Sequence, residues 1–204
     1  AVKGVLRDSK AAVKAIFSEP CLRLFIPTAM LLNLLSAGAL ALVLPFCLEK
    51  NFTVDSYGYL MSVWTVASLV CVMLLGAIKF KPKARYWIMA IGFITSEVFM
   101  ILAYLSVDFV PMCILVFAGA FLNCAGNSVF NASLMLALPE ENRGAILGFI
   151  QSASIGGTAL STVIYGFLGD IFPLYIVFAV GSAISLMPML YLCLNRRTRD
   201  FILN

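Results

Sequence analysis

Long apolar stretches alternate with short polar connectors along the whole chain. Only one of the six stretches contains a charged residue, Glu97 in the third. Each stretch is long enough for a helix that crosses a lipid bilayer, which takes roughly 20 residues. The pattern therefore predicts six transmembrane helices, over the ranges Leu24–Leu48, Ser56–Ile78, Tyr86–Val107, Phe109–Leu138, Gly144–Gly169 and Ile171–Asn195.

Two of these stretches carry signs of irregular helices. The fourth would be about 45 Å long at the rise of an α-helix, so we expect it to tilt, to bend near Gly119 or Gly126, or to emerge from the membrane. The first contains Pro27 and Pro45 near its ends. Proline removes a helical hydrogen bond, so kinks are expected there, either as tolerated bends or as gates.

Composition explains why lipid is the solvent. Hydrophobic residues make up 62% of the 204 residues and charged residues 12%, about half the charged share of a soluble domain. Histidine, the commonest general base and metal ligand, is absent. The six cysteines form no Cys-x-x-Cys pair. We therefore expect no enzyme, with an intramembrane enzyme the weakest alternative, and no cofactor, metal or nucleic-acid partner.

Basic residues indicate the orientation of the chain. Thirteen of the fourteen lysines and arginines lie in connectors of one side, and only Lys50 lies on the other. Because basic residues are enriched on the cytoplasmic side, an even number of spans places both termini in the cytoplasm of a multi-pass plasma (inner) membrane protein. The expected domains are a cytoplasmic amphipathic linker (1–21), a six-helix transmembrane domain (22–195) and a cytoplasmic basic tail (196–204).

The linker has a regular charge pattern. Lys3, Arg7, Lys10 and Lys14 share one face of a helix. Such a helix can lie on the anionic inner leaflet, where each basic residue contributes about 1 kcal/mol. A solvated linker that only keeps positive charge inside is the other interpretation. Both agree on the topology.

Polar residues inside the spans are the candidates for a functional site, because they are costly against lipid. Asn123, Asn127 and Asn131 recur every four residues on one helical face. The alternative is hydrogen bonding between helices, worth about 0.6 kcal/mol per bond in membranes. Asn33 lies near the middle of the first span.

The fifth span has two distinct faces. One is polar and includes Gln151 and Thr158. Serine and threonine can bond to their own helix, so that face does not by itself require a ligand. A separate ridge of small residues is typical of close helix packing; it consists of Gly144, Gly148, Ser152 and Gly156.

Two connectors resemble a known family. The turn Pro139-Glu140-Glu141-Asn142-Arg143-Gly144 resembles the Pro-Glu-x-x-Arg-Gly turn that opens the eleventh helix of major facilitator superfamily transporters, especially the macrolide-efflux-like branch. The segment from Gly76 to Arg85 is similar in part to that family's Gly-x-x-x-Asp-Arg-x-Gly-Arg-Arg loop. Gly76, Lys81 and Arg85 match, whereas Phe80 replaces the acid and Lys83 the glycine, so an inner charge network that uses the acid is altered. The resemblance implies that the gating and loop residues are Gly76, Lys81, Arg85, Arg143 and Gly144.

The resemblance covers nearly the whole chain but only the C-terminal six of the family's usual twelve helices. It implies an all-α membrane fold of two inverted three-helix repeats, with the fourth helix lining a central cavity and the third outside the bundle. Candidates for substrate contact in the cavity are Asn33, Asn123, Asn127, Asn131, Gln151 and Thr158. We expect a preceding N-terminal six-helix half, because the basic residues before the first span resemble the family's central loop. A second copy or a separate subunit is the alternative.

The implied function is secondary active transport by alternating access. We expect a small-molecule solute, an amphipathic drug-like compound, to be exported across the lipid bilayer, with possible proton or sodium coupling as an antiporter. Glu97 is the candidate for proton coupling, with a structural hydrogen-bonding role as the alternative. The competing function is a non-transporting membrane subunit or scaffold that assembles through helix packing.

Overall fold

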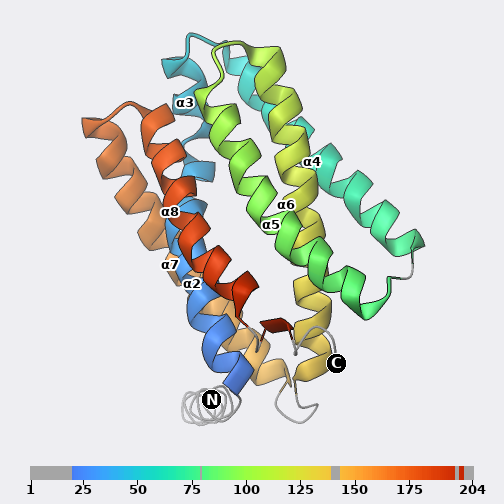
Figure 1. Cartoon of the computed structure of the whole chain (residues 1–204). Helices are drawn as coiled ribbons and strands as arrows, with labels where there is room; N and C mark the ends of the chain where they lie inside the picture. The colour runs from blue at the N-terminus through green and yellow to red at the C-terminus, as the bar shows by residue number, and fades with distance from the viewer. Residues whose placement is uncertain (1–19, 79, 139–142, 196–197, 200–204) are drawn as a thin grey trace.

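The computed structural model describes residues 20–78, 80–138, 143–195 and 198–199 (Figure 1). This part of the chain is helical and contains no strand. The helices are α2 (Pro20–Ala41), α3 (Val43–Glu49), α4 (Val54–Ala77), α5 (Pro82–Leu105), α6 (Phe109–Ala137), α7 (Arg143–Ile171) and α8 (Leu174–Leu194). The Pro139–Asn142 turn, nearly all of the expected linker 1–21 and most of the tail 196–204 lie outside the described residues.

The helices have the length and composition needed to cross a membrane. Each of the helices from α4 to α8 qualifies alone, and α2 with α3 makes a sixth span, bent by 55°, if the pair is counted as one. The predicted all-α fold of six transmembrane helices is therefore confirmed. The apolar side chains left exposed on the bundle are those that lipid would cover.

Pro45 explains the bend between α2 and α3. A proline has no N–H, and its ring collides with the carbonyl four residues earlier, here that of Ala41. The helix breaks at this point, where the Leu42 N–H donates to the Ala39 carbonyl at 3.0 Å. Pro27, by contrast, lies within α2 and does not end it.

Helix α6 has nearly its expected bounds, whereas the connection between α7 and α8 lies further along the chain than expected. Helix α6 runs for 29 residues without a break, so neither Gly119 nor Gly126 interrupts it. Helix α7 continues through Asp170 to Ile171, and α8 begins only after Pro173. A single acid in the last turn of a helix is tolerated, whereas proline cannot continue one.

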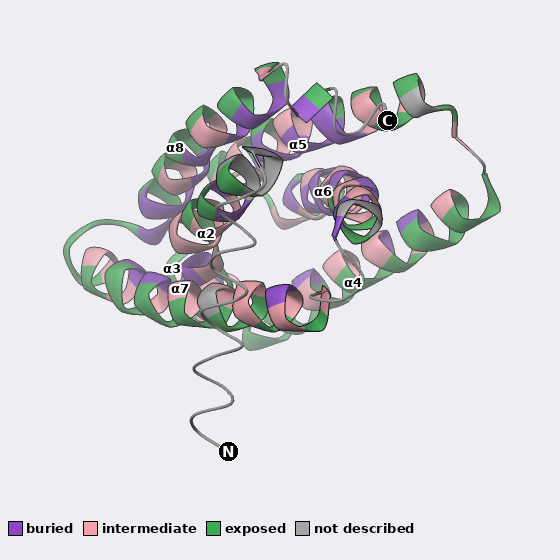
Figure 2. Cartoon of the chain, turned by 90° about the horizontal axis from the view of Figure 1, so that it is seen from below, coloured by how far each residue is buried: buried purple, intermediate pink, exposed green. Residues whose placement is uncertain are grey.

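The packing has the symmetry of an inverted repeat. The first repeat comprises α2 with α3, α4 and α5, and the second comprises α6, α7 and α8. In this symmetry α2 corresponds to α6, α4 to α7 and α5 to α8. The contact between α2 and α7 then corresponds to the contact between α6 and α4, and that between α2 and α8 to that between α6 and α5. All four pairs of helices are in contact. Seen from the end, α5 and α8 lie along one side of the bundle, α4 and α7 along the other, and α2 and α6 between them (Figure 2).

The two ends of the bundle differ in the helix termini and connectors that lie there. Helix α2 begins and α8 ends at the same end as the α4–α5 connector (Figure 1). At the opposite end, which we term the α3 end, two adjacent residues connect α3 to its neighbours. The Glu49 carboxylate accepts the Leu174 N–H at 2.8 and 3.1 Å, and the Lys50 ammonium donates to the Ser106 carbonyl.

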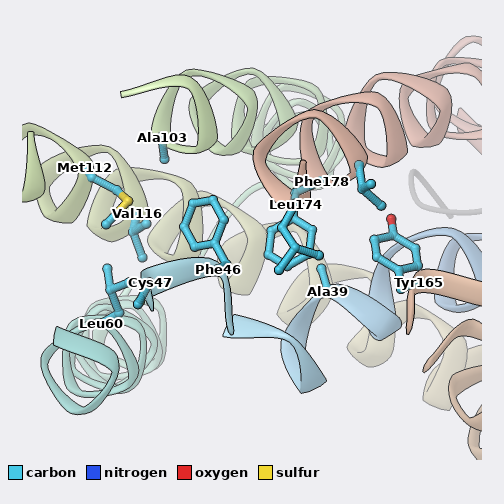
Figure 3. Close-up of a cluster of buried hydrophobic side chains, with 11 residues drawn as sticks. Ala39, Phe46, Cys47, Leu60, Ala103, Met112, Val116, Tyr165, Leu174 and Phe178 are labelled. Atoms are coloured by element: carbon cyan, nitrogen blue, oxygen red, sulfur yellow. The ribbon is translucent and has the colours of Figure 1, made fainter. Parts of the chain in front are cut away.

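A hydrophobic cluster fills the bundle next to the α3 end. Phe46 of α3, Tyr165 of α7 and Phe178 of α8 are among its buried members (Figure 3). The Phe46 and Phe178 rings stack with their centroids 5.0 Å apart. Aromatic pairs of this kind add about 0.5–1.5 kcal/mol beyond the area that they bury. The short helix α3 is thus packed into the bundle by its own aromatic side chain.

Candidate functional site: a central cavity

Two adjoining cavities lie inside the helix bundle. The larger, of about 270 Å³, is lined by residues of every helix from α2 to α8. The smaller, of about 210 Å³, is lined by α2, α5, α6 and α8. They share four lining residues, all polar: Asn33, Ser36, Glu97 and Asn123. We call these four the polar junction.

The α2 members of the polar junction are held by their own helix. The Asn33 amide nitrogen donates to the Ala29 carbonyl at 3.0 Å, and the Ser36 hydroxyl donates to the Leu32 carbonyl at 2.7 Å. Each bond runs back one helical turn and restricts the rotamer of the side chain. The amide group of Asn33 therefore reaches both cavities in a defined orientation.

The two cavity-lining asparagines of α6 form a unit. The Asn127 amide nitrogen donates to the Asn123 side-chain oxygen at 2.8 Å and to its main-chain carbonyl at 3.0 Å. The Asn123 side-chain oxygen is thereby engaged, which turns its NH₂ group away from Asn127 and makes it a donor for another acceptor. Asn123 lines both cavities, and Asn127 lines the smaller one.

Glu97 is the acidic member of the polar junction. Its side chain is only 8% exposed, and Ser182 of α8 is within hydrogen-bonding reach of its carboxyl. The resemblance implied that the third helix lies outside the bundle, away from the substrate path. Helix α5 does lie along one side (Figure 2), yet it is rotated so that Glu97 faces the cavities.

Close packing against α6 contributes to this rotation of α5. An added Cβ at Gly92 would be 2.9 Å from the Leu122 carbonyl oxygen of α6. Likewise, a Cβ added at Gly126 of α6 would be 2.8 Å from the Phe93 ring of α5. Glycine on both sides lets the two helices approach each other face to face, with Glu97 about five residues further along α5.

An aromatic wall surrounds the larger cavity and was missed from the sequence. It comprises Phe46, Trp64, Tyr104, Tyr165 and Phe178, each from a different helix. The Tyr165 hydroxyl donates to the Leu35 carbonyl of α2, which fixes its ring. Aromatic residues occur throughout the apolar stretches, so no local signal distinguished these five. The only clue was that Tyr165 follows Thr158 and Ser161 at helical spacing, on the polar face of the fifth span.

The other sequence-derived candidates line neither of the two cavities. Asn131 and Gln151 are exposed, and Thr158 is half-buried. The loop candidates lie at helix ends: Gly76 in the last turn of α4, Lys81 just before α5, Arg85 in the first turn of α5, and Arg143 and Gly144 at the start of α7. One of the Arg143 amino groups donates to the Leu138 carbonyl at 3.1 Å and so connects the end of α6 to α7.

These features define a class of protein: a polytopic helical membrane protein whose inverted repeats enclose a cavity with polar and aromatic walls. The family model of the Major Facilitator Superfamily matches residues 28–201, and the chain belongs to that superfamily. It is therefore a membrane transporter in the general sense of that family. Comparisons with curated proteins and with solved structures found no match.

Proposed function

We propose that the chain is the C-terminal half of a secondary active transporter that exports small amphipathic, drug-like compounds by alternating access. The observation that carries the proposal is the central cavity. Its walls are mostly apolar and aromatic, with a few amide and hydroxyl groups, most of them where it adjoins the smaller cavity. Walls of this kind bind apolar bodies without strict shape requirements, while the few polar groups orient them. The proposed branch is the macrolide-efflux-like one.

An N-terminal six-helix half is proposed as the partner. Support comes from α4 and α7, of which only 17% and 12% of the span residues are buried, against 33–44% for α5, α6 and α8. The ridge glycines of α7, Gly144, Gly148 and Gly156, would each accept a Cβ with no atom of the described residues within 4 Å. Small residues allow close helix approach. The ridge is therefore suited to pack against helices outside the described chain.

The proposed location is the plasma membrane, with the termini in the cytoplasm. The end of the bundle at which α2 begins also holds Lys81, Lys83, Arg85 and Arg143. The α3 end has Lys50. This distribution supports a cytoplasmic position for the basic end.

Exchange of the solute for a proton or a sodium ion is proposed as the energy source. Glu97 supports the coupling, since a buried carboxyl next to a cavity can take up a proton or, as a carboxylate, bind a sodium ion. In this role it is the acid of an antiporter.

Accumulation of a fluorescent amphipathic dye in cells that express the complete natural gene product tests the function. We expect the active protein to lower dye accumulation and Asn123→Leu to abolish most of that effect, because leucine removes the amide that faces both cavities. Asn131→Leu, two turns along α6 and outside both cavities, is the matched control and should keep the effect. Unchanged accumulation with the unsubstituted protein, over several dyes, would refute export.

A further inference from the structure

Among the residues that the structure describes, Glu97 is the only acidic one that lines either cavity, and no lysine or arginine among them lines the cavities. In the described part of the chain, the titratable groups that interact with the carboxyl are Tyr104 of its own helix and Tyr165 of α7. Both are phenols, which supply no positive charge. The carboxyl therefore faces the cavities without a cation from their walls.

A carboxylate in the interior of a membrane protein is costly when charged and lacks a partner. Ser182 can contribute a hydrogen bond, and the amides of Asn33 and Asn123 lie in the same polar junction. Neutral groups reduce the cost but do not compensate a full charge, as a cation does. A positively charged solute that enters the cavity would gain the interaction that the protein itself does not provide.

The aromatic wall favours the same kind of ligand. The faces of aromatic rings are electrically negative and attract ammonium groups, by about 0.5–2 kcal/mol according to how far water is excluded. Rings of this region already attract a cation outside the cavity, since the Lys50 ammonium lies 5.4 Å from the Phe46 ring centroid and 5.7 Å from that of Tyr175. Within the cavity, Trp64, the residue type that binds cations best, is half-buried in the wall.

We propose that the transported solute is an organic cation, whose positive nitrogen lies against Glu97 and whose apolar part lies among the aromatic wall. The size of the larger cavity, about 270 Å³, is just under the range of about 300–1,000 Å³ typical of ligand pockets. It suits a substituted ammonium ion with one apolar group, or the ammonium end of a larger molecule. This inference rests on the proposed function and names the substrate class of the same cavity.

The test compares two probes of the same shape that differ in charge. Benzyltrimethylammonium is the cation, and neopentylbenzene, in which carbon replaces the nitrogen, is its neutral counterpart. A quaternary ammonium is charged at every pH, so protonation of the probe does not affect the result. The complete gene product is reconstituted into phospholipid vesicles, and binding of the tritiated cation is measured, with protein-free vesicles as the correction for partition into lipid.

We expect saturable binding of the cation that an equal concentration of the neutral probe does not displace. Glu97→Gln should weaken binding about thirtyfold or more, as expected for removing one partner of a buried charge pair. Glu97→Asp, which keeps the negative charge, should retain part of the cation binding. The matched control is Asp170→Asn, an acid-to-amide change at an exposed position of α7, which should leave binding unchanged.

A second variant guards against failure of Glu97→Gln to fold, which thermal melting of each variant would reveal. Trp64→Leu removes the ring but keeps an apolar wall, and should weaken cation binding about fivefold. Displacement of the cation by an equal concentration of the neutral probe, or cation binding that survives Glu97→Gln in the folded variant, would overturn the inference. If neutral dyes are still exported in that case, the proposed function stands. If no dye is exported, the proposed function fails as well.

Discussion

Gly38 determines how closely α2 and α7 approach each other beside the cavity. Its N–H donates to the Ser161 hydroxyl of α7 at 2.7 Å, and an added Cβ would be 2.5 Å from the Ser161 carbonyl oxygen. Its neighbours Ala37 and Ala39 both line the larger cavity. A side chain at position 38 would therefore push apart two helices that form the cavity wall.

We predict that Gly38→Ala destabilises the protein by about 1–3 kcal/mol, the usual cost of forcing extra atoms into packed helices. Gly58→Ala is the matched control, because an added Cβ there has no atom of the described residues within 4 Å and alanine favours a helix. Thermal melting of the detergent-solubilised variants measures both. Equal melting temperatures for the two variants would show that the contact between α2 and α7 is not tight.

Residues of the site were predictable only where helical spacing indicates them. The four-residue spacing of the asparagines indicated a common face, and Asn123 and Asn127 do line cavities. Asn131 shares the face but lies about 12 Å along the helix from Asn123, outside both cavities. The inward orientation of Glu97 could not be predicted, because it depends on the rotation of α5 about its own axis against α6.

At the scale of elements, α3 is held in place by its neighbours. It has seven residues, too few to be stable as an isolated helix. Phe46 packs it against α8 and Glu49 accepts the first N–H of α8. The N-cap residue of α8 is Pro173, which makes no side-chain capping bond. A carboxylate from another helix thus takes the place of the missing cap.

We predict that Glu49→Ala lowers stability by up to about 1 kcal/mol, the range for loss of an N-cap. It should also loosen the packing of the bent span at the α3 end. Asp170→Ala is the comparison, since an acid in the last turn of α7 opposes the helix dipole and its removal should have no cost. Hydrogen exchange of the first-turn amides of α8 reports the local effect. Unchanged exchange there in Glu49→Ala would contradict the capping role.

The helical spans were predictable because bilayer thickness sets their length, and their apolar stretches are long and free of charge. The bend between α2 and α3 was harder to predict. Pro45 indicated a kink near the end of the first span, but the 55° angle reflects where α3 finds aromatic partners on α5 and α8. Those partners are far apart in the sequence, so no local pattern shows them.

At the scale of the whole molecule, the basic residues and the helix directions agree on two distinct ends. We predict that Lys83→Cys is cytoplasmic and Val107→Cys, at an 84% exposed position of the α3 end, is extracellular, in a variant whose native cysteines are alanine. A membrane-impermeant maleimide should label Val107→Cys in intact cells and Lys83→Cys only after lysis. Labelling of Lys83→Cys in intact cells would reverse the proposed orientation.

The small-residue ridge of α7 is the surface on which we propose that the second half packs. Close packing of small residues was expected from the sequence, but among the described residues nothing lies within 4 Å of a Cβ added at Gly148 or Gly156. A ridge that faced only lipid would tolerate a large apolar residue. A ridge that packs closely against other helices would not, because leucine is far too large for the space between two helix backbones.

We therefore predict that Gly148→Leu in the complete gene product lowers its melting temperature and abolishes dye export, although a Cβ at this position meets no atom of the described residues within 4 Å. Ala183→Leu is the control, since it makes the same kind of change at an exposed position of α8, on the other side of the bundle. If both variants melt and export alike, the ridge faces lipid, and a second half must cover α4 and α7 in another way or not at all. A selective defect of Gly148→Leu would identify α7 as the helix that joins the two halves.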